Sequence, residues 1–240
     1  MTHTDSEPHP GDLESIAAQL RASLSATNSA REEALRLSRE TIQFSSRAIR
    51  ALHRGERADA ERLTGEARKR VDAVRSALKN TPEVYHSGYV HDSQKEYVEA
   101  ETMLAIIGKG PLLSHIDLGV EPAAYLNGIA EAASESRRYV LDRLRIGDVS
   151  NAESTLQMMD DIYYELIGID FPDAITGGLR RTTDALRAVL ERTRGDVTMT
   201  LANQRLQQAI RDVIAMQPQP QPQPDIAFSF DASLEHDRDE

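Results

Sequence analysis

The chain has 240 residues, a formal net charge of −11, no Cys, no Trp and only 5% aromatic residues. Without Cys there is no disulfide, thiolate metal site or Cys nucleophile, and no apolar run approaches the roughly 20 residues that a membrane span requires. A composition dominated by Ala, Leu and Arg is typical of long helices packed through small and aliphatic side chains, which predicts an all-α protein without a membrane partner.

The acidic charge is concentrated at the two ends of the chain. Residues 1–14 hold four acids and no base, and residues 225–240 hold six acids and one base. These segments contribute −4 and −5 to the total of −11, which leaves −2 for residues 15–224. The acidic total therefore does not exclude a nucleic-acid partner. We expect residues 1–11 to form a flexible leader. Because this leader is polar and acidic, unlike a signal or transit peptide, we predict a cytoplasmic location.

Between residues 12 and 216 the apolar residues recur at helical spacing, and we predict one all-α domain there, an antiparallel bundle of six or seven helices. The predicted helices cover residues 12–54, 57–78, 83–107, 122–146, 150–167 and 174–216. Interruptions are expected near Thr27–Asn28, at Gly88 and near Gly195. Beyond the domain, residues 217–240 begin with alternating Gln and Pro, which predicts an extended spacer followed by a disordered acidic tail.

Two of these helices carry pairs of Glu at helical spacing. Glu96 and Glu99 are three residues apart, and Glu131 and Glu135 are four apart, so each pair projects from one face of its helix. Both faces also carry apolar residues, and a carboxylate at the edge of a core is costly unless it is paired, protonated or bound to a cation. The pairs could converge on one hard divalent ion such as Mg²⁺. The spacing alone is equally typical of solvated or ion-paired helix faces.

Several short motifs, in their order and spacing, resemble the translin superfamily, which comprises translin and its catalytic partner, translin-associated factor X. The resemblance covers about residues 30–215. It includes the Gln94–Ala100 run, which matches the Q-E-Y-V-E-A pattern of the catalytic partner apart from the inserted Lys95. The other matching segments are Ile49–Arg54, Tyr125–Ala130 and Gly147–Asp148.

The resemblance implies an all-helical subunit that assembles into closed homo-oligomeric shells, alone or with a paralogous subunit, and binds single-stranded RNA or DNA. In the catalytic partner, acids on the equivalent helices hold Mg²⁺ and cut single-stranded RNA. Glu96 and Glu99 match this E-x-x-E and place the chain closer to the catalytic branch. Glu131 departs from the family pattern, which has Asp there, and Glu135 matches a position that both branches share, so its role could be structural.

We therefore expect a metal-dependent endoribonuclease in which Glu96, Glu99 and Glu131 hold one Mg²⁺ or Mn²⁺, with Glu135 as a further ligand or its neighbour. Cations must accompany these acids for RNA to bind. The candidates are Arg50, His53, Arg54, Arg68, Lys69, Arg70, Arg137 and Arg138. The first six lie in residues 31–75, which carry a net charge of +4 and could instead form an ion-paired helical hairpin. His53, at a helix end, could equally be a capping or partly buried residue.

Three other functions remain open at this stage. A translin-like oligomer could bind single strands without cutting them, with its Glu residues paired to neighbouring Arg residues. An all-α nucleoside triphosphate pyrophosphohydrolase also places E-x-x-E and a further acidic pair around Mg²⁺. A purely structural interaction protein could use the Gln-Pro segment as its docking element.

Overall fold

The computed structural model describes residues 12–216, and within this range the chain forms nine α-helices and no strand. The predicted all-α class is confirmed. Residues 1–11 and 217–240, to which we assigned the leader, the Gln-Pro spacer and the acidic tail, lie outside the described residues. The helices are α1 (Leu13–His53), α2 (Arg57–Ala77), α3 (Pro82–Tyr85), α4 (Gly88–Gly108), α5 (His115–Leu118), α6 (Pro122–Arg145), α7 (Val149–Ile167), α8 (Asp173–Thr176) and α9 (Leu179–Met216).

Two predicted interruptions are wrong because the residues that suggested them cost a helix little. Helix α1 begins where predicted, with the Asp12 carboxylate accepting a hydrogen bond from the Ser15 amide at 2.7 Å, but it continues unbroken through Thr27 and Asn28. Helix α9 likewise continues through Gly195. A Gly inside a helix costs only about 1 kcal/mol, which is too little to end a helix that is packed on both sides of that position.

The real break in this region lies at Gly177 and Gly178, between α8 and α9. Both residues have positive φ, at 63° and 86°, a backbone conformation that glycine adopts without strain and that ends α8. The predicted kink at Gly88 is a complete interruption, since α3 ends at Tyr85 and α4 starts anew at Gly88.

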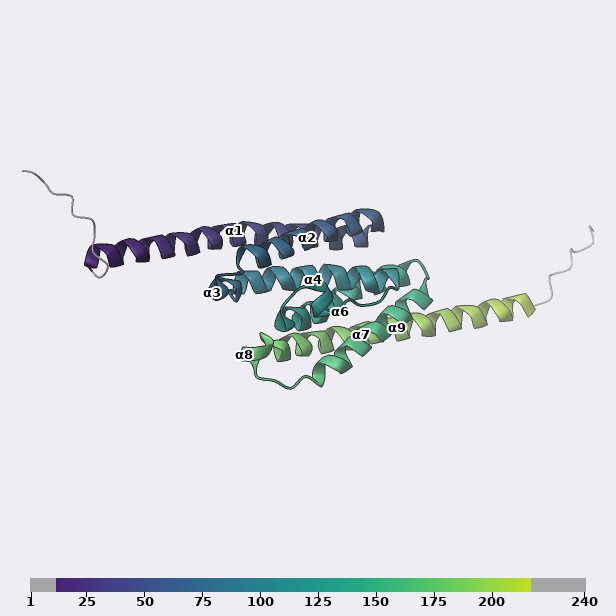
Figure 1. Ribbon diagram of the computed structural model, residues 1–240. Helices are drawn as coiled ribbons and strands as arrows, with labels where there is room; N and C mark the ends of the chain where they lie inside the picture. Colours follow the sequence, from purple (N-terminus) through teal and green to yellow (C-terminus); the bar gives the residue numbers. More distant parts are fainter. Residues whose placement is uncertain (1–11, 217–240) are drawn as a thin grey trace, which may run out of the picture. The chain divides into compact units, whose positions relative to one another are not determined.

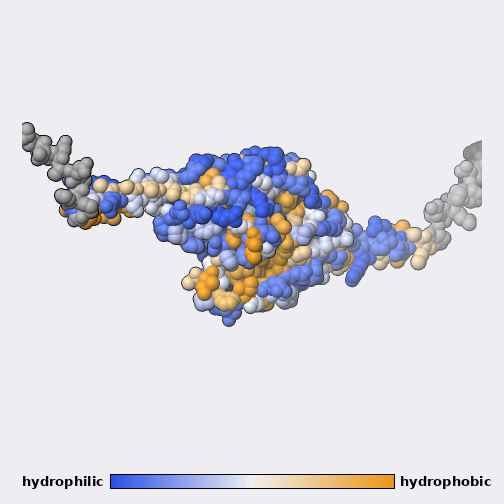
Figure 2. All heavy atoms as spheres, in the orientation of Figure 1, coloured by the Kyte–Doolittle hydropathy of each residue, from blue (hydrophilic) through white to orange (hydrophobic). Residues whose placement is uncertain are grey.

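Of the residues that the structure describes, 12–201 form one compact unit. The antiparallel α1–α2 hairpin packs on α4, the opposite face of α4 packs on α6, and α6 packs on α7, as Figure 1 shows. The first half of α9 completes this unit, because its Leu186 and Leu190 share one buried cluster with Met159 and Ile162 of α7. The surface over α1 and α2 is mostly hydrophilic, whereas apolar surface gathers further down the same face (Figure 2).

The chain from residue 202 onward is a separate unit, of which the structure describes the end of α9. Leu206, Ile210 and Val213 recur there at a spacing of four and three residues, and all three are exposed. They form an apolar stripe on an exposed helix. None of the described helices is long and apolar enough to cross a membrane.

Helix α6 packs tightly against α4 at Gly128. A Cβ atom built on Gly128 would lie 2.6 Å from Cβ of Val98 and 2.8 Å from the backbone oxygen of Lys95. Because backbone and a buried β-branched side chain cannot yield as a flexible side chain would, only glycine fits this position without moving one helix. Ala100 on α4 and Ala132 on α6 are fully buried nearby and also permit close packing.

We expect Gly128→Ala to lower the free energy of unfolding by about 1–3 kcal/mol, because the added methyl group forces α4 and α6 apart. Urea denaturation followed by circular dichroism measures this change. The matched control is Gly65→Ala, on the exposed surface of α2, where no heavy atom lies within 4 Å of the new Cβ. That control should raise the free energy of unfolding by about 0.4–1 kcal/mol. Equal effects of the two substitutions would contradict the proposed contact.

Candidate metal centre

Three of the four predicted acids meet where α4 faces α6. One carboxylate oxygen from each of Glu96, Glu99 and Glu131 lies within 4.8 Å of the other two. The i,i+3 spacing places the first two on the face of α4 that contacts α6, and the close packing at Gly128 brings the third within reach. All three side chains are partly buried. An all-carboxylate set of this kind suits Mg²⁺ or Mn²⁺, which prefer oxygen ligands.

Glu135, the fourth predicted acid, has a different partner. Its Oε1 atom lies 2.6 Å from Nε2 of His53 at the end of α1, and the His53 side chain is only 2% exposed. Among the described residues, the other ring nitrogen of His53 has no hydrogen-bond partner. His53 is thus the partner of Glu135, and their contact joins α1 to α6 beside the three-carboxylate cluster.

The crowding of these acids changes their protonation. Burial, followed by the negative charges of Glu96, Glu131 and Glu135, raises the pKa of Glu99 to about 8. Burial also raises the pKa of Glu96, against the lowering effect of Lys95. At neutral pH the metal-free centre therefore holds a proton on the carboxyl group of Glu99.

Lys95 is the cation of this centre, although in the sequence it stands out only as an insertion in the Gln94–Ala100 motif. Its Nζ atom lies 2.9 Å from Oε1 of Glu131. Burial acts to lower the pKa of Lys95, but the hydrogen bond to Glu131 and the nearby acids raise it overall. One signal could have identified this role: Lys95 precedes Glu99 by four residues and so shares its helix face.

Most of the predicted nucleic-acid contacts are engaged within the protein. Arg54 pairs with Glu56, Lys69 pairs with Glu66, and Arg70 pairs with Glu40 and Glu66 while lying over the ring of Phe44. Arg137 pairs with Asp196 and donates to the Thr193 hydroxyl, which ties α6 to α9. The basic segment is thus largely an ion-paired hairpin, although pairs as exposed as those of Arg54 and Lys69 contribute little and can exchange for phosphate.

The remaining candidates have no carboxylate partner within 4.0 Å among the described residues. Arg68 donates to the backbone oxygen of Asp117, Arg50 donates to the Ser46 hydroxyl, and Arg138 is exposed on α6 three residues beyond Glu135. These three guanidinium groups lie on three different helices, α2, α1 and α6. As positioned, they are the candidates that can contact phosphate without first losing a salt bridge.

Comparison with known proteins places this geometry in context. No protein-family model matches the chain. It is 30% identical over 189 residues to an uncharacterized protein of Methanocaldococcus jannaschii, covering 78% of this chain and 83% of that protein. The crystal structure of AfC3PO and the structure of an AfC3PO–duplex RNA complex each match with 35% identity and a TM-score of 0.73, covering 78% of this chain and 97% of theirs. Apo-NeC3PO, at 21% identity and a TM-score of 0.66, matches 81% of this chain and all of its own and shares the fold.

The raised pKa of Glu99 predicts a pH dependence of stability. Because the folded protein keeps this proton up to about pH 8 while the unfolded chain loses it near 4.5, the folded state binds more protons between these values, and its stability falls as pH rises through them. In chelator, Glu99→Gln should exceed the wild type in free energy of unfolding by roughly 1–3 kcal/mol at pH 9, and by less at pH 5. Urea denaturation across this range, with Glu153→Gln on the exposed face of α7 as control, measures the difference. Parallel pH profiles for the wild type and Glu99→Gln would show that the proton lies elsewhere.

Removing Lys95 should tighten metal binding, because its ammonium group competes with the ion for Glu131. We expect Lys95→Gln to bind Mn²⁺ about three- to tenfold more tightly than the wild type, which corresponds to the loss of one competing interaction of about 1 kcal/mol. Isothermal titration calorimetry at pH 8.5 measures the affinity. Lys79→Gln, which removes an exposed Lys beyond α2, is the charge-matched control and should leave it unchanged. Weaker binding by Lys95→Gln would mean that Lys95 supports the ion instead of competing with it.

Proposed function

The chain belongs to the translin superfamily, the family of the C3PO proteins, and from this premise we propose that it binds RNA and hydrolyses single-stranded RNA with a divalent metal ion. The observation that carries the proposal is the convergence of Glu96, Glu99 and Glu131 from two neighbouring helices. The family assignment leaves the pyrophosphohydrolase alternative without support.

Glu96, Glu99 and Glu131 would hold Mg²⁺ or Mn²⁺. When bound, the ion supplies a Lewis acid that activates a water molecule and neutralises charge on the reacting phosphate. For these residues to bind it, the Glu99 carboxyl group must release its proton and Glu131 must release the ammonium group of Lys95. Glu135, held by His53, adds negative charge beside the ligands and fixes α6 against the end of α1.

Nucleic-acid binding rests on a second line of support. AfC3PO, at 35% identity, has been solved in complex with duplex RNA. In this chain, Arg50, Arg68 and Arg138 have no carboxylate partner among the described residues and can contact phosphates directly. The preference for single strands follows from the proposed hydrolysis, since a strand must be accessible at the carboxylate cluster.

We further propose that the protein acts as a closed oligomer of this chain, with or without a paralogous subunit. The exposed stripe of Leu206, Ile210 and Val213 at the end of α9 supports assembly. Exposure of these apolar side chains to water is unfavourable, and their burial against another subunit would stabilise the oligomer.

A non-catalytic RNA-binding oligomer is the second candidate, and a specific observation favours it. In its metal-free form the carboxylate cluster is already compensated, by the Lys95 ammonium group and by the proton on Glu99. A cluster neutralised in this way can be stable without an ion. This candidate predicts RNA affinity that is independent of Mg²⁺ and no cleavage.

Cleavage of a labelled single-stranded RNA distinguishes the two candidates. We expect the wild type to cut in Mg²⁺ or Mn²⁺ and not in chelator, and Glu96→Gln or Glu99→Gln to lose roughly 100-fold or more of the rate while retaining RNA binding. Glu135→Gln should lose about 10- to 100-fold.

The matched control is Glu101→Gln. Glu101 lies on the same helix as the cluster and is partly buried, but it accepts a hydrogen bond from Tyr97 at 3.0 Å and belongs to a different face. The Glu101→Gln variant should therefore cleave RNA at close to the wild-type rate. Binding by the wild type without any metal-dependent cleavage would overturn the nuclease proposal and favour the non-catalytic oligomer.

A further inference from the structure

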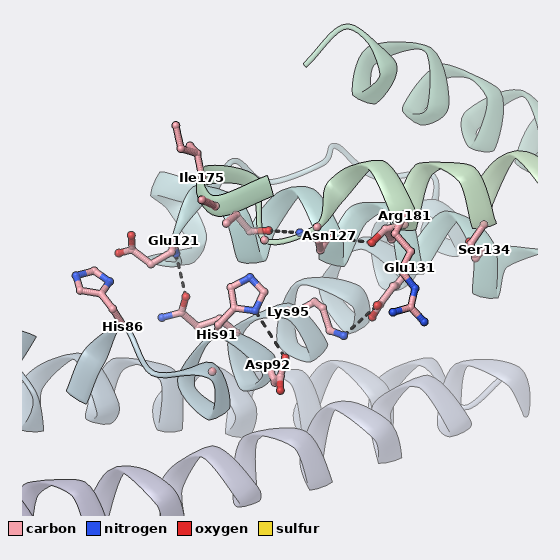
Figure 3. A pocket seen from close by; sticks show the side chains of 18 of the residues that line it. His86, His91, Asp92, Lys95, Glu121, Asn127, Glu131, Ser134, Ile175 and Arg181 are labelled. Carbon is pink, nitrogen blue, oxygen red and sulfur yellow. Dashed lines mark hydrogen bonds and ion pairs between the residues drawn. The ribbon is translucent and has the colours of Figure 1, made fainter. Parts of the chain in front are cut away.

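A cleft of about 920 Å³ opens beside the carboxylate cluster and shares Glu131 with it, and Lys95, the ion-pair partner of Glu131, also lines the cleft. Its walls come from α3, α4, α6, the short helix α8 and the start of α9. Figure 3 shows Lys95, Glu131 and Arg181 at one end of the cleft, with His86, Glu121 and Ile175 at the other. Nothing in the proposed hydrolysis accounts for this cleft.

The end next to the carboxylate cluster has cations that the fold does not use. Arg181 lines the cleft, and its side chain has no carboxylate within 4.0 Å and no hydrogen-bond partner among the described residues. Lys95 is paired with Glu131. If that carboxylate bound a metal ion as proposed above, the Lys95 ammonium group would be released on the cleft side and add positive charge there.

The middle of the cleft presents hydrogen-bond donors. The amide of Gly178, which lines the cleft, has no acceptor among the described residues, and the dipole of α9 adds positive potential there. Nε2 of His91 is buried against the same turn and has no partner among the described residues. The turn can lie against this ring because residue 177 is Gly: a Cβ there would fall 3.1 Å from Nε2.

The turn that carries these donors is held firmly in place. The side-chain amide of Asn127 on α6 donates to the backbone oxygen of Thr176 at 2.8 Å, and its side-chain oxygen accepts a hydrogen bond from the Thr182 hydroxyl at 2.7 Å. Asn127 is buried, and its side-chain nitrogen also donates to the backbone oxygen of Ala123 at 2.9 Å. The donors around the Gly177–Gly178 turn are thus preorganised, which lowers the entropy cost of binding a ligand.

Of the three acids that line the cleft, Glu131 lies at the Arg181 end, where it is paired with the Lys95 ammonium group. The Asp92 carboxylate is largely exposed and 3.7 Å from the other ring nitrogen of His91, and Glu121 lies near His86 at the far end. Because Lys95 neutralises Glu131, the charge of Arg181 favours an anion at that end, whereas Glu121 disfavours one at the far end. His86 and Tyr85, whose rings meet edge to face at 5.3 Å, instead offer aromatic surface at that far end.

We propose that this cleft is the subsite for the nucleotide next to the scissile phosphate, a role that rests on the function proposed above. Arg181 and the Gly178 amide bind the phosphate of that nucleotide, and the ring surfaces of Tyr85 and His86 face its base. Lys95 joins the phosphate ligands once Glu131 binds metal. The cleft thereby sets which bond of the strand reaches the carboxylate cluster.

Binding of a fluorescently labelled single-stranded RNA to the full chain, in chelator so that no cleavage occurs, tests the subsite. Arg181→Gln should weaken binding about five- to tenfold. The matched control is Arg180→Gln: this neighbouring side chain is 78% exposed, pairs with Asp170 and does not line the cleft, so its loss should change affinity less than twofold. Ala185→Phe, at an exposed position of the cleft wall, should also weaken binding by occupying the space.

Competition with adenosine monophosphate and with inorganic phosphate identifies the source of the ligand. The mononucleotide should displace RNA from the wild type and lose this ability in Arg181→Gln, while phosphate alone should compete more weakly. Equal RNA affinities for Arg181→Gln and Arg180→Gln would overturn the subsite, as would a mononucleotide that binds through Arg181 without displacing RNA. Cleavage in Mg²⁺ is measured in parallel. RNA binding that depends on Arg181 but is not followed by cleavage would support the subsite and contradict the nuclease activity. Cleavage together with RNA binding that does not depend on Arg181 would support the nuclease activity and contradict the subsite.

Discussion

The close contact between α4 and α6 is the constraint on which the rest of the structure depends. Gly128 lies against Val98 and the backbone of Lys95, so that neither helix can move inward or accept a side chain at the crossing. Glu96 and Glu99 are one turn or less from that contact on α4, and Glu131 follows it by three residues on α6. The distance between the carboxylates is therefore set by backbone packing, which is stiff, and only secondarily by the flexible Glu side chains.

This arrangement costs stability, and the protein offsets the cost in two ways. Three acids within 4.8 Å repel one another, and partial burial strengthens the repulsion. A proton on Glu99 and the ammonium group of Lys95 reduce it in the metal-free form. The proton and the ammonium group can both be replaced by a divalent ion, whereas apolar side chains at these positions could not bind one. The residues that stabilise the metal-free fold therefore leave room for an ion. Acids kept together at such a cost are more typical of a functional site than of a scaffold.

The sequence was a good guide to what is local and a poor one to what is tertiary. Helix boundaries such as Asp12, Leu78 and Pro122, and the facing of the Glu pairs, follow from capping and from the 3.6-residue period, and the structure reproduces them closely. The pairing of His53 with Glu135 spans 82 residues, and that of Lys95 with Glu131 spans 36, so no periodicity could show either.

The basic α1–α2 hairpin shows that the sequence reveals charge but not how that charge is paired. Its charge excess was visible in the sequence, but the engagement of Arg70 by Glu40 and Phe44 depends on how α1 packs on α2. The break before α9 was misplaced for a different reason. Gly195 and Gly177 are the same residue type, and only the backbone conformation, helical at one and left-handed at the other, separates them.

Glu131 belongs both to the carboxylate cluster and to the cleft beside it, and its ion-pair partner Lys95 also lines the cleft, so this pair connects the two sites. With the proposed roles, a cation that bound Glu131 would displace Lys95 towards the cleft, where its ammonium group would add to the charge of Arg181. Conversely, a phosphate that held Lys95 in the cleft would remove the competitor from Glu131. By thermodynamic linkage these two effects would be equal in free energy, so the proposed metal and nucleotide would each favour the binding of the other. In that scheme the single ion pair between α4 and α6 restrains the centre when substrate is absent and releases it when substrate arrives.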